Sequence, residues 1–297
     1  MRKHQVKLYI IFYIILILIP VFIVGRSLKH IETEIYIRKA LSQGINYDEF
    51  RNIRTNKKQM DTIKRYTAKL IDKNPDFSEY KYMDYIGYLT FAMILTDYDL
   101  LHSRVPNEKI FLRGIGRLSQ TRAYQELYEY YKAIFSDLKY FPVPYMGQGA
   151  YNVSYEDSWN APRSYGGARG HEGTDLMAGN NKRGYFPIIS ITDGIIENMG
   201  WLEQGGYRIG VRSESGGYFY YAHLDSYAPE LSEGDTVIAG QLLGFMGDSG
   251  YGREGTIGQF DVHLHMGIYV QNASREISVN PYWILRMLEH SRTELLH

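Results

Sequence analysis

The sequence predicts an α+β protein in which the structural classes follow one another along the chain: a transmembrane helix, an α-helical region and an all-β domain. Three observations support this order. Residues 8–25 are uncharged and mostly apolar, residues 27–140 carry apolar side chains at helical spacing, and from residue 141 glycine-rich turns separate short β-type runs. We therefore divide the chain into residues 1–26, 27–140 and 141–297.

Composition narrows the kinds of site that the chain can build. It has 33 basic and 33 acidic residues and no cysteine. The balanced charge gives no global attraction to nucleic acid, so we expect no nucleic-acid partner. Without cysteine there is no disulfide framework and no thiolate ligand, and any metal chemistry must use histidine and carboxylate.

The first segment contains the run LYIIFYIILILIPVFIVG, which is long enough to cross a hydrocarbon core of about 30 Å as a helix. Arg2, Lys3 and Lys7 precede it, so the positive-inside rule places the N-terminus in the cytoplasm. A cleaved signal peptide is the alternative, but the run is longer than a usual signal core and no small-residue cleavage site follows it. We expect a single-pass cell-membrane protein whose remaining residues are extracytoplasmic.

The second segment reads as a helical stalk or small bundle. Apolar side chains recur at i, i+3, i+4 and i+7 within residues 124–138. The run YIGYLTFAMIL at residues 85–95 is too short to span a bilayer and is interpreted as a buried helix. Pro75 and Pro106 separate the helices. We interpret the stripe as core packing, with a groove for an envelope protein partner as the alternative.

The third segment begins where Pro142 and Pro144 end the helical pattern and glycine becomes frequent. Short β-type runs then alternate with turns, which is typical of an antiparallel sandwich or barrel-like fold. The runs are YFPIISITDG, IIENMGW, YRIGVRS, GYFYYAHL, TVIAGQLLGFMG and VHLHMGIYV.

The histidines of this segment indicate where its chemistry lies. His263 and His265 stand at i and i+2 of a predicted strand, so they project from the same face. His171 begins a stretch like the H-E-x-x-H helix of zinc proteases, but Asp175 stands where that motif needs its second histidine. Flanking glycines favour a turn over a helix, and the H-E-x-x-H interpretation is therefore excluded.

Taken together, these positions supply two imidazoles and a carboxylate for a mononuclear zinc site with one position open for water. Catalytic zinc sites are built in this way, and a bound water is acidified towards neutrality. His223 and the remaining histidine of the H-x-H pair are then free for proton transfer or for stabilising charge on a carbonyl oxygen. A structural zinc would have four protein ligands, commonly including cysteine, so we expect one catalytic Zn²⁺.

Six segments between residues 157 and 285 resemble, in order, the LytM/lysostaphin-type murein metalloendopeptidases, zinc peptidases that cut peptide bonds in bacterial peptidoglycan. The resemblance implies a two-layer antiparallel LytM-like fold, the duplicated hybrid motif, with a groove across it. The matching segments are ARGHEGTDLMA, ITDGIIENMGW, YYAHLDSY, LSEGDTVIAGQLLGFMGDSG, VHLHMGIYV and VNPYWIL.

Carried over by position, the resemblance implies that His171, Asp175 and His265 bind Zn²⁺ and that His223 and His263 are the catalytic histidines. Zinc would polarise the peptide carbonyl and lower the pKa of its water. We assign His263 to deprotonation and His223 to the tetrahedral oxyanion, two roles that can be exchanged.

Three further residues are candidates for substrate binding or for supporting the site. Arg169 lies two residues before the first zinc candidate and could meet a substrate carbonyl or carboxylate, or form a surface salt bridge. Tyr221 is expected partly in the core and partly in the groove wall. Asp261 lies two residues before His263 on the same strand face, where it could orient that imidazole or be an exposed carboxylate.

The resemblance thus implies a membrane-anchored zinc metalloendopeptidase that hydrolyses stem peptides or cross-bridges of peptidoglycan. The alternative is a non-hydrolytic scaffold or activator of the same fold, in division or in a sporulation intermembrane channel. Such relatives usually lack one or more of the five site positions, and all five are present here, which favours catalysis. The bond that is cleaved, and whether the helical region is autoinhibitory, stay open.

Overall fold

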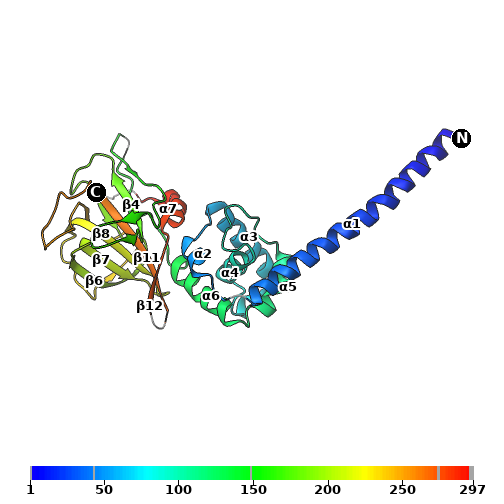
Figure 1. Ribbon diagram of the computed structural model, residues 1–297, viewed down its shortest axis with the longest axis horizontal. Helices are drawn as coiled ribbons and strands as arrows, with labels where there is room; N and C mark the ends of the chain where they lie inside the picture. The colour runs from blue at the N-terminus through cyan, green and yellow to red at the C-terminus, as the bar shows by residue number, and fades with distance from the viewer. Residues whose placement is uncertain (1, 43, 148, 273–274, 294–297) are drawn as a thin grey trace.

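A computed structural model describes residues 2–42, 44–147, 149–272 and 275–293. It confirms the predicted order of an apolar N-terminal helix, a helical region and an antiparallel β domain (Figure 1). The helices of the first two parts are α1 (Arg2–Ser42), α2 (Tyr47–Asn52), α3 (Lys57–Lys73), the short 3₁₀ helix η1 (Pro75–Glu79), α4 (Tyr85–Leu95), α5 (Glu108–Leu118) and α6 (Arg122–Phe135).

Helix α1 serves two environments. Its stretch Ile11–Leu28 is long and apolar enough to cross a membrane, the only such stretch in the described part of the chain, and it is fully exposed in the structure. Beyond it the same helix packs on the helical region, where Ile37 is buried and Lys39 pairs with Asp97 at 2.9 Å. The boundary proposed at residue 26 thus falls inside one continuous helix, and the three-part division stays a prediction.

Helix α4 is the centre of the helical region, as expected for the run at residues 85–95. Its residues from Ile86 to Met93 are all buried, and α1, α3, α5 and α6 pack around it. The Asp84 carboxylate caps its first turn, accepting from the backbone N–H of Gly87 at 2.7 Å. The apolar stripe of α6 is buried against it, which confirms the interpretation of that stripe as core.

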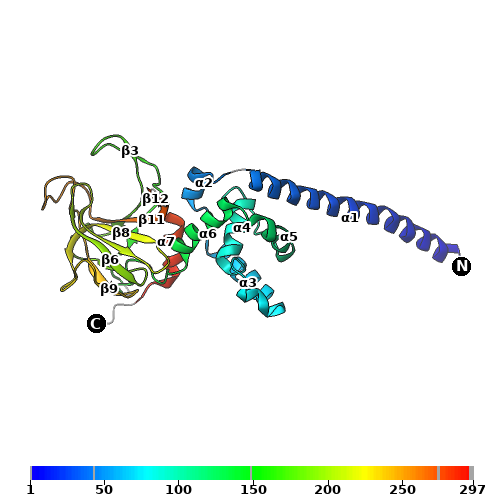
Figure 2. The same cartoon turned by 90° about the horizontal axis from the view of Figure 1, so that it is seen from below.

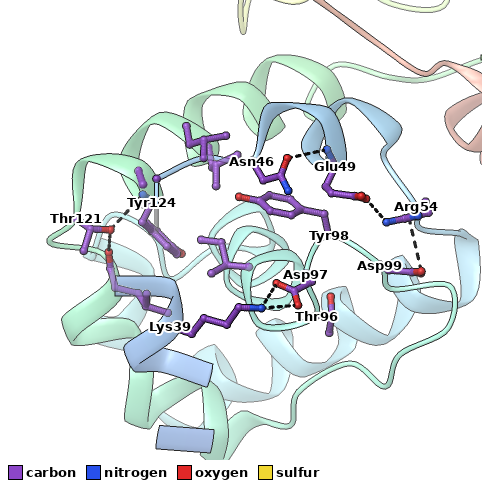
Figure 3. A pocket seen from close by; sticks show the side chains of 16 residues that line it. Lys39, Asn46, Glu49, Arg54, Thr96, Asp97, Tyr98, Asp99, Thr121 and Tyr124 are labelled. Carbon is purple, nitrogen blue, oxygen red and sulfur yellow. Dashed lines mark hydrogen bonds and ion pairs between the residues drawn. The ribbon is translucent and has the colours of Figure 1, made fainter. Parts of the chain in front are cut away.

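A cavity of about 700 Å³ lies in the helical region beside the C-terminal end of α1 (Figure 3). Two clusters of charge line it. Lys39 binds Asp97, and Arg54 lies against Glu49 and, at 3.6 Å, against Asp99. Every charged side chain of this lining therefore has a partner of opposite charge among the described residues.

The β domain is one antiparallel sheet with the order β1-β4-β11-β8-β7-β6-β9, in which β10 joins β5 to β8 and β12 joins β11, and a separate two-stranded ribbon, β2-β3. Helix α7 follows β12 (Figure 2). The strands are β1 (Val153–Ser154), β2 (Pro162–Arg163), β3 (Arg169–Gly170), β4 (Thr174–Ala178), β5 (Pro187–Ile189), β6 (Gly194–Leu202), β7 (Gly206–Arg212), β8 (Tyr218–Tyr227), β9 (Thr236–Val237), β10 (Leu242–Met246), β11 (His263–Asn272) and β12 (Arg275–Val279), followed by α7 (Tyr282–Leu288) and a 3₁₀ turn η2 (Glu289–Ser291).

The helical region is fastened to the β domain through Arg51 of α2. Its guanidinium donates to the carbonyl of Ser278 at 2.8 Å, to the Ser278 hydroxyl at 2.6 Å and to the carboxylate of Glu172 at 2.7 Å. It also lies over the Trp159 ring, 5.2 Å from the centroid. One side chain thus joins helix α2, strand β12 and both ends of the segment from Trp159 to Glu172, which contains His171.

Removing this side chain should weaken the whole assembly. Arg51→Ala leaves the Ser278 carbonyl and Glu172 without their charged partner, and we expect the free energy of unfolding to fall by about 1–3 kcal/mol. Urea unfolding of the full chain in detergent measures it. Arg113→Ala, on the exposed face of α5, is the matched control and should change stability by no more than about 0.5 kcal/mol. Equal effects of the two variants would contradict this role for Arg51.

Candidate metal centre

Strand register brings three donor atoms together. Asp175 of β4 and His265 of β11 are directly paired in the antiparallel ladder, so their side chains share a face. Asp175 Oδ1 lies 2.9 Å from His265 Nδ1 and 3.1 Å from His171 Nε2, and the two histidine nitrogens are 3.0 Å apart. The H-x-x-x-D stretch thus meets the H-x-H strand as a single cluster.

The surroundings of His171 fix which of its nitrogens faces the cluster. Its Nδ1 lies 3.2 Å from the carbonyl oxygen of Ser158 and 3.0 Å from the hydroxyl of that serine. A carbonyl only accepts, so Nδ1 carries the proton and Nε2 keeps its lone pair for the cluster. With 2% of its surface exposed, His171 has little freedom to turn away.

A β-bulge aims His223 at the cluster. In the ladder between β7 and β8, Tyr207 pairs with Leu224 and Ile209 pairs with Tyr221, so two residues of β8 oppose one of β7. His223 takes φ 61°, a left-handed conformation that is uncommon for residues other than glycine. Regular alternation would leave His223 on the same face as the core residue Tyr221. The bulge turns its ring to the cavity instead.

His223 and His263 are oriented in the same way. His223 Nδ1 lies 2.8 Å from the carbonyl oxygen of Ser249, and His263 Nδ1 lies 2.7 Å from that of Asp261. Both Nδ1 atoms therefore donate, and both Nε2 atoms are left as acceptors. His263 Nε2 is 3.8 Å from Asp175 Oδ1, and the rings of His223 and His263 are 4.7 Å apart. Two proton-accepting nitrogens thus stand beside the three-donor cluster.

Burial and charge set the protonation of the cluster. Burial would raise the pKa of Asp175, but its close contacts with the His171 and His265 rings outweigh burial and hold that pKa far below its usual range. Burial lowers the pKa of His223 well below its ordinary value, with the neighbouring His263 and His265 adding to the shift. The pKa of His265 is also lowered, chiefly by burial. Asp175 is thus held as a carboxylate, and His223 and His265 favour the neutral imidazole, the form in which histidine binds a metal ion.

Arg163 is a site residue that sequence reasoning missed. Its guanidinium donates to Asp175 Oδ2, the oxygen that points away from the histidines. Arg163 belongs to the two-residue strand β2, whose partner β3 leads to His171. No pattern in the sequence marks so short a ribbon, and the contact depends on how the ribbon folds over the sheet.

The three supporting candidates lie in different surroundings. Arg169 lines the cavity beside His171. Tyr221 does not: it is fully buried on the opposite face of β8, where its hydroxyl accepts from the backbone N–H of Ile191 at 2.9 Å, and Tyr220 lines the cavity instead. Asp261 meets His263 through its backbone carbonyl, whereas its carboxylate accepts from Asn181 at 3.0 Å.

The cluster lies in a cavity of about 640 Å³. The glycine-rich loop between β10 and β11 borders it with Tyr251 and Phe260, whose rings lie 6.0 and 4.6 Å from that of His223. Tyr251 stacks on Tyr165, the two ring centroids being 4.2 Å apart. This loop is therefore a wall of the groove and not only a solvent loop.

The donor set fits a metal ion such as zinc. Two imidazole nitrogens and a carboxylate oxygen are its common catalytic ligands, and tetrahedral bonds of about 2.0–2.1 Å would hold such donors roughly 3.3 Å apart. The observed separations of 2.9–3.1 Å are close to that. Gly173 makes the approach possible, because a Cβ there would lie 2.4 Å from His265 Cε1.

The Gly173 contact yields a prediction. Gly173→Ala should push the His265 ring out of line with Asp175 and weaken zinc binding by about 10- to 100-fold, the range found when residues that orient metal ligands are changed. Competition with a zinc-chelating dye measures the affinity. Gly116→Ala, on the exposed face of α5 with open space around the added methyl group, provides the control, and zinc affinity lowered equally in both variants would contradict the prediction.

The lowered histidine pKa values predict a pH dependence of stability. In the metal-free protein, His223 and His265 stay neutral when folded, whereas the unfolded chain protonates them below about pH 6.5. The unfolded state then binds more protons, so stability is present above this pH and falls with acidification, by up to about 1.4 kcal/mol per pH unit for each proton. Urea unfolding between about pH 7 and about pH 5, the range in which an ordinary histidine titrates, measures how steeply stability changes with pH. His223→Asn should make stability less dependent on pH. An unchanged pH dependence would contradict the conclusion that the buried His223 contributes to it.

Comparison with known proteins agrees with this geometry. The family model described as Peptidase family M23 matches residues 169–281, the part that contains the cluster. The L-Ala--D-Glu endopeptidase of Bacillus subtilis (strain 168) is 36% identical over 204 residues, 67% of this chain and 59% of the relative. Lysostaphin of Staphylococcus simulans is 31% identical over 102 residues, 34% of this chain and 19% of the relative. The chain thus spans less than two thirds of the length of these curated relatives.

A solved structure extends the similarity beyond the β domain. The crystal structure from Ruminococcus gnavus ATCC 29149 that is provisionally assigned as the glycyl-glycine endopeptidase lytM is 37% identical, with a TM-score of 0.68. The match covers 88% of this chain and 98% of that one, so it includes helical residues as well as the sheet. With the family model lying over the His-Asp-His cluster and a relative matched along nearly its whole length, this chain belongs to peptidase family M23, of the LytM type.

Proposed function

We propose that this protein is a membrane-anchored zinc endopeptidase that hydrolyses peptide bonds of peptidoglycan. The observation that carries the proposal is the convergence of His171 Nε2, Asp175 Oδ1 and His265 Nδ1 beside two further histidines in an open cavity. The matched M23 relatives are named endopeptidases, which supports the reaction class.

In this proposal His171, Asp175 and His265 hold one Zn²⁺, and His223 and His263 act on protons. Bound zinc would supply Lewis-acid polarisation and acidify a water molecule. Each catalytic histidine can take a proton at Nε2 and return it, because its Nδ1–H is tied to a backbone carbonyl. We keep His263 for deprotonation of the water and His223 for the developing oxyanion, and their matching orientation leaves these two roles exchangeable.

We further propose that α1 anchors the protein, with the N-terminus in the cytoplasm and the peptidase outside. The exposed apolar stretch Ile11–Leu28 supports an anchor, and so does the packing of the same helix on the helical region through Ile37. A signal sequence passes the same length test. The mass of the protein recovered from membranes separates the two, because cleavage near residue 26 would remove the apolar stretch.

The names of the matched relatives refer to two different peptide bonds. One is an L-Ala–D-Glu bond and the other is a Gly–Gly bond. For this chain we propose a peptide bond of the stem peptide or of the cross-bridge, and the charges of the groove bear on which of them it is.

Digestion of purified, defined peptidoglycan by the full chain with zinc, read by mass spectrometry, tests the function. We expect metal-dependent peptide products. His263→Ala should lower the rate by about 100-fold or more, as for loss of a general base. His265→Ala removes a zinc ligand and should abolish zinc-dependent cleavage. The exposed His290 provides a matched control, and His290→Ala should cleave normally. Zinc binding without cleavage of any wall type would favour a non-hydrolytic scaffold.

A further inference from the structure

Each acidic side chain that lines the cavity has a basic side chain beside it. Each has a basic partner among the described residues, at distances up to 3.8 Å. The pairs are Glu172 with Arg51, Asp175 with Arg163, and Glu276 with Arg212. Glu172 and Asp175, the two that flank the metal cluster, are thus paired, whereas Glu276 shares Arg212 with Glu197, which binds it at 2.6 Å.

Two arginines of the same lining are not neutralised. Within the described part of the chain, neither Arg169 nor Arg208 forms an ion pair, although both side chains border the cavity. Arg169 Nε and Arg208 Nη1 are buried and have no hydrogen-bond partner there. A buried donor without an acceptor is costly, and more so on a charged group. Both guanidinium groups are thus placed where an anion would satisfy them.

Arg169 has a second reason to need an anion. It is the direct partner of Arg163 across the β2-β3 ribbon, and like charges that face each other in this way repel. The guanidinium of Arg163 is satisfied by Asp175 Oδ2, whereas that of Arg169 is left over. A carboxylate from outside would complete the ribbon.

Arg208 is placed by the bulge that turns His223. The ladder sets this one residue of β7 against Ala222 and His223 of β8. Tyr218 and Tyr220 line the cavity on the same strand β8. Arg169 comes from the ribbon before β4 and Arg208 from the strand beyond β8, so the two positive charges approach the metal cluster from different elements.

We propose that Arg169 and Arg208 bind carboxylate groups of the substrate, so that the groove selects an acidic stem peptide over a neutral glycine peptide. The planar guanidinium matches a carboxylate with two parallel hydrogen bonds. A glutamate residue keeps one carboxylate free whichever of its two carboxyl groups is in the chain, and a glycine bridge has none. This inference rests on the proposed peptidase function and names the substrate class of the same site.

The test compares two synthetic peptides that differ in a single charge: a stem peptide containing L-Ala and D-Glu, and the same peptide with the free carboxylate of that glutamate converted to the carboxamide. For the unaltered full chain with zinc we expect kcat/KM to favour the acidic peptide by about 10- to 100-fold, the value of one or two charge-assisted hydrogen bonds. Arg169→Gln and Arg208→Gln should each narrow this ratio through KM, and the double variant should bring it close to unity.

Conservative and matched variants separate charge from folding. Arg208→Lys keeps the charge but not the planar fork, so it should retain part of the preference. Arg113→Gln changes the net charge equally on the exposed face of α5 and should leave the ratio intact. A ratio near unity in the unaltered protein, a preference for the carboxamide, or a ratio that the double variant leaves intact would overturn the proposal while the peptidase function stands.

If neither peptide is cleaved, the digestion of whole peptidoglycan decides whether the peptidase function fails, and calorimetric affinities of the full chain for the two peptides decide on the anion site alone. Binding of the acidic peptide about tenfold or more tightly, lost in the double variant, supports the site. Equal affinities overturn it.

Discussion

The direct pairing of Asp175 with His265 across β4 and β11 is the interaction on which the rest of the site depends. A slip of β4 along β11 by one residue would send the Asp175 side chain to the face of the sheet opposite His265. The single carboxylate then organises everything near it: its Oδ1 faces two histidines and its Oδ2 holds Arg163. One carboxylate thus joins strand β4 to β11, to the segment of His171 and to the β2-β3 ribbon.

The second constraint is backbone strain at His223. A left-handed residue other than glycine costs on the order of 1 kcal/mol or more, and it persists only where the surroundings over-determine it. Here the backbone N–H of His223 donates to Gly205 at 2.8 Å and its ring donates to Ser249 at 2.8 Å. A Cβ at Gly250 would lie 3.2 Å from that ring, so a glycine keeps the space open. The strain therefore positions the ring for function.

Sequence alone predicted the features that follow from local periodicity and from the family resemblance. The i, i+2 rule placed His263 and His265 on one face, and length separated the buried helix α4 from a membrane span. The rule of alternation failed at the bulge, which is why Tyr221 is in the core and Tyr220 lines the groove. Arg51, Arg163 and Arg208 were missed because their contacts join segments that only the folded sheet brings together.

The helical region also acts on the site, since Arg51 holds Glu172 directly after His171 and stacks on Trp159 directly after Ser158. The most direct test of the whole account is the position of the metal. Diffraction data collected at the zinc absorption edge should show one anomalous peak bonded to His171 Nε2, Asp175 Oδ1 and His265 Nδ1, with His223 and His263 not bonded. A peak held by other residues, or by either of those two histidines, would contradict it.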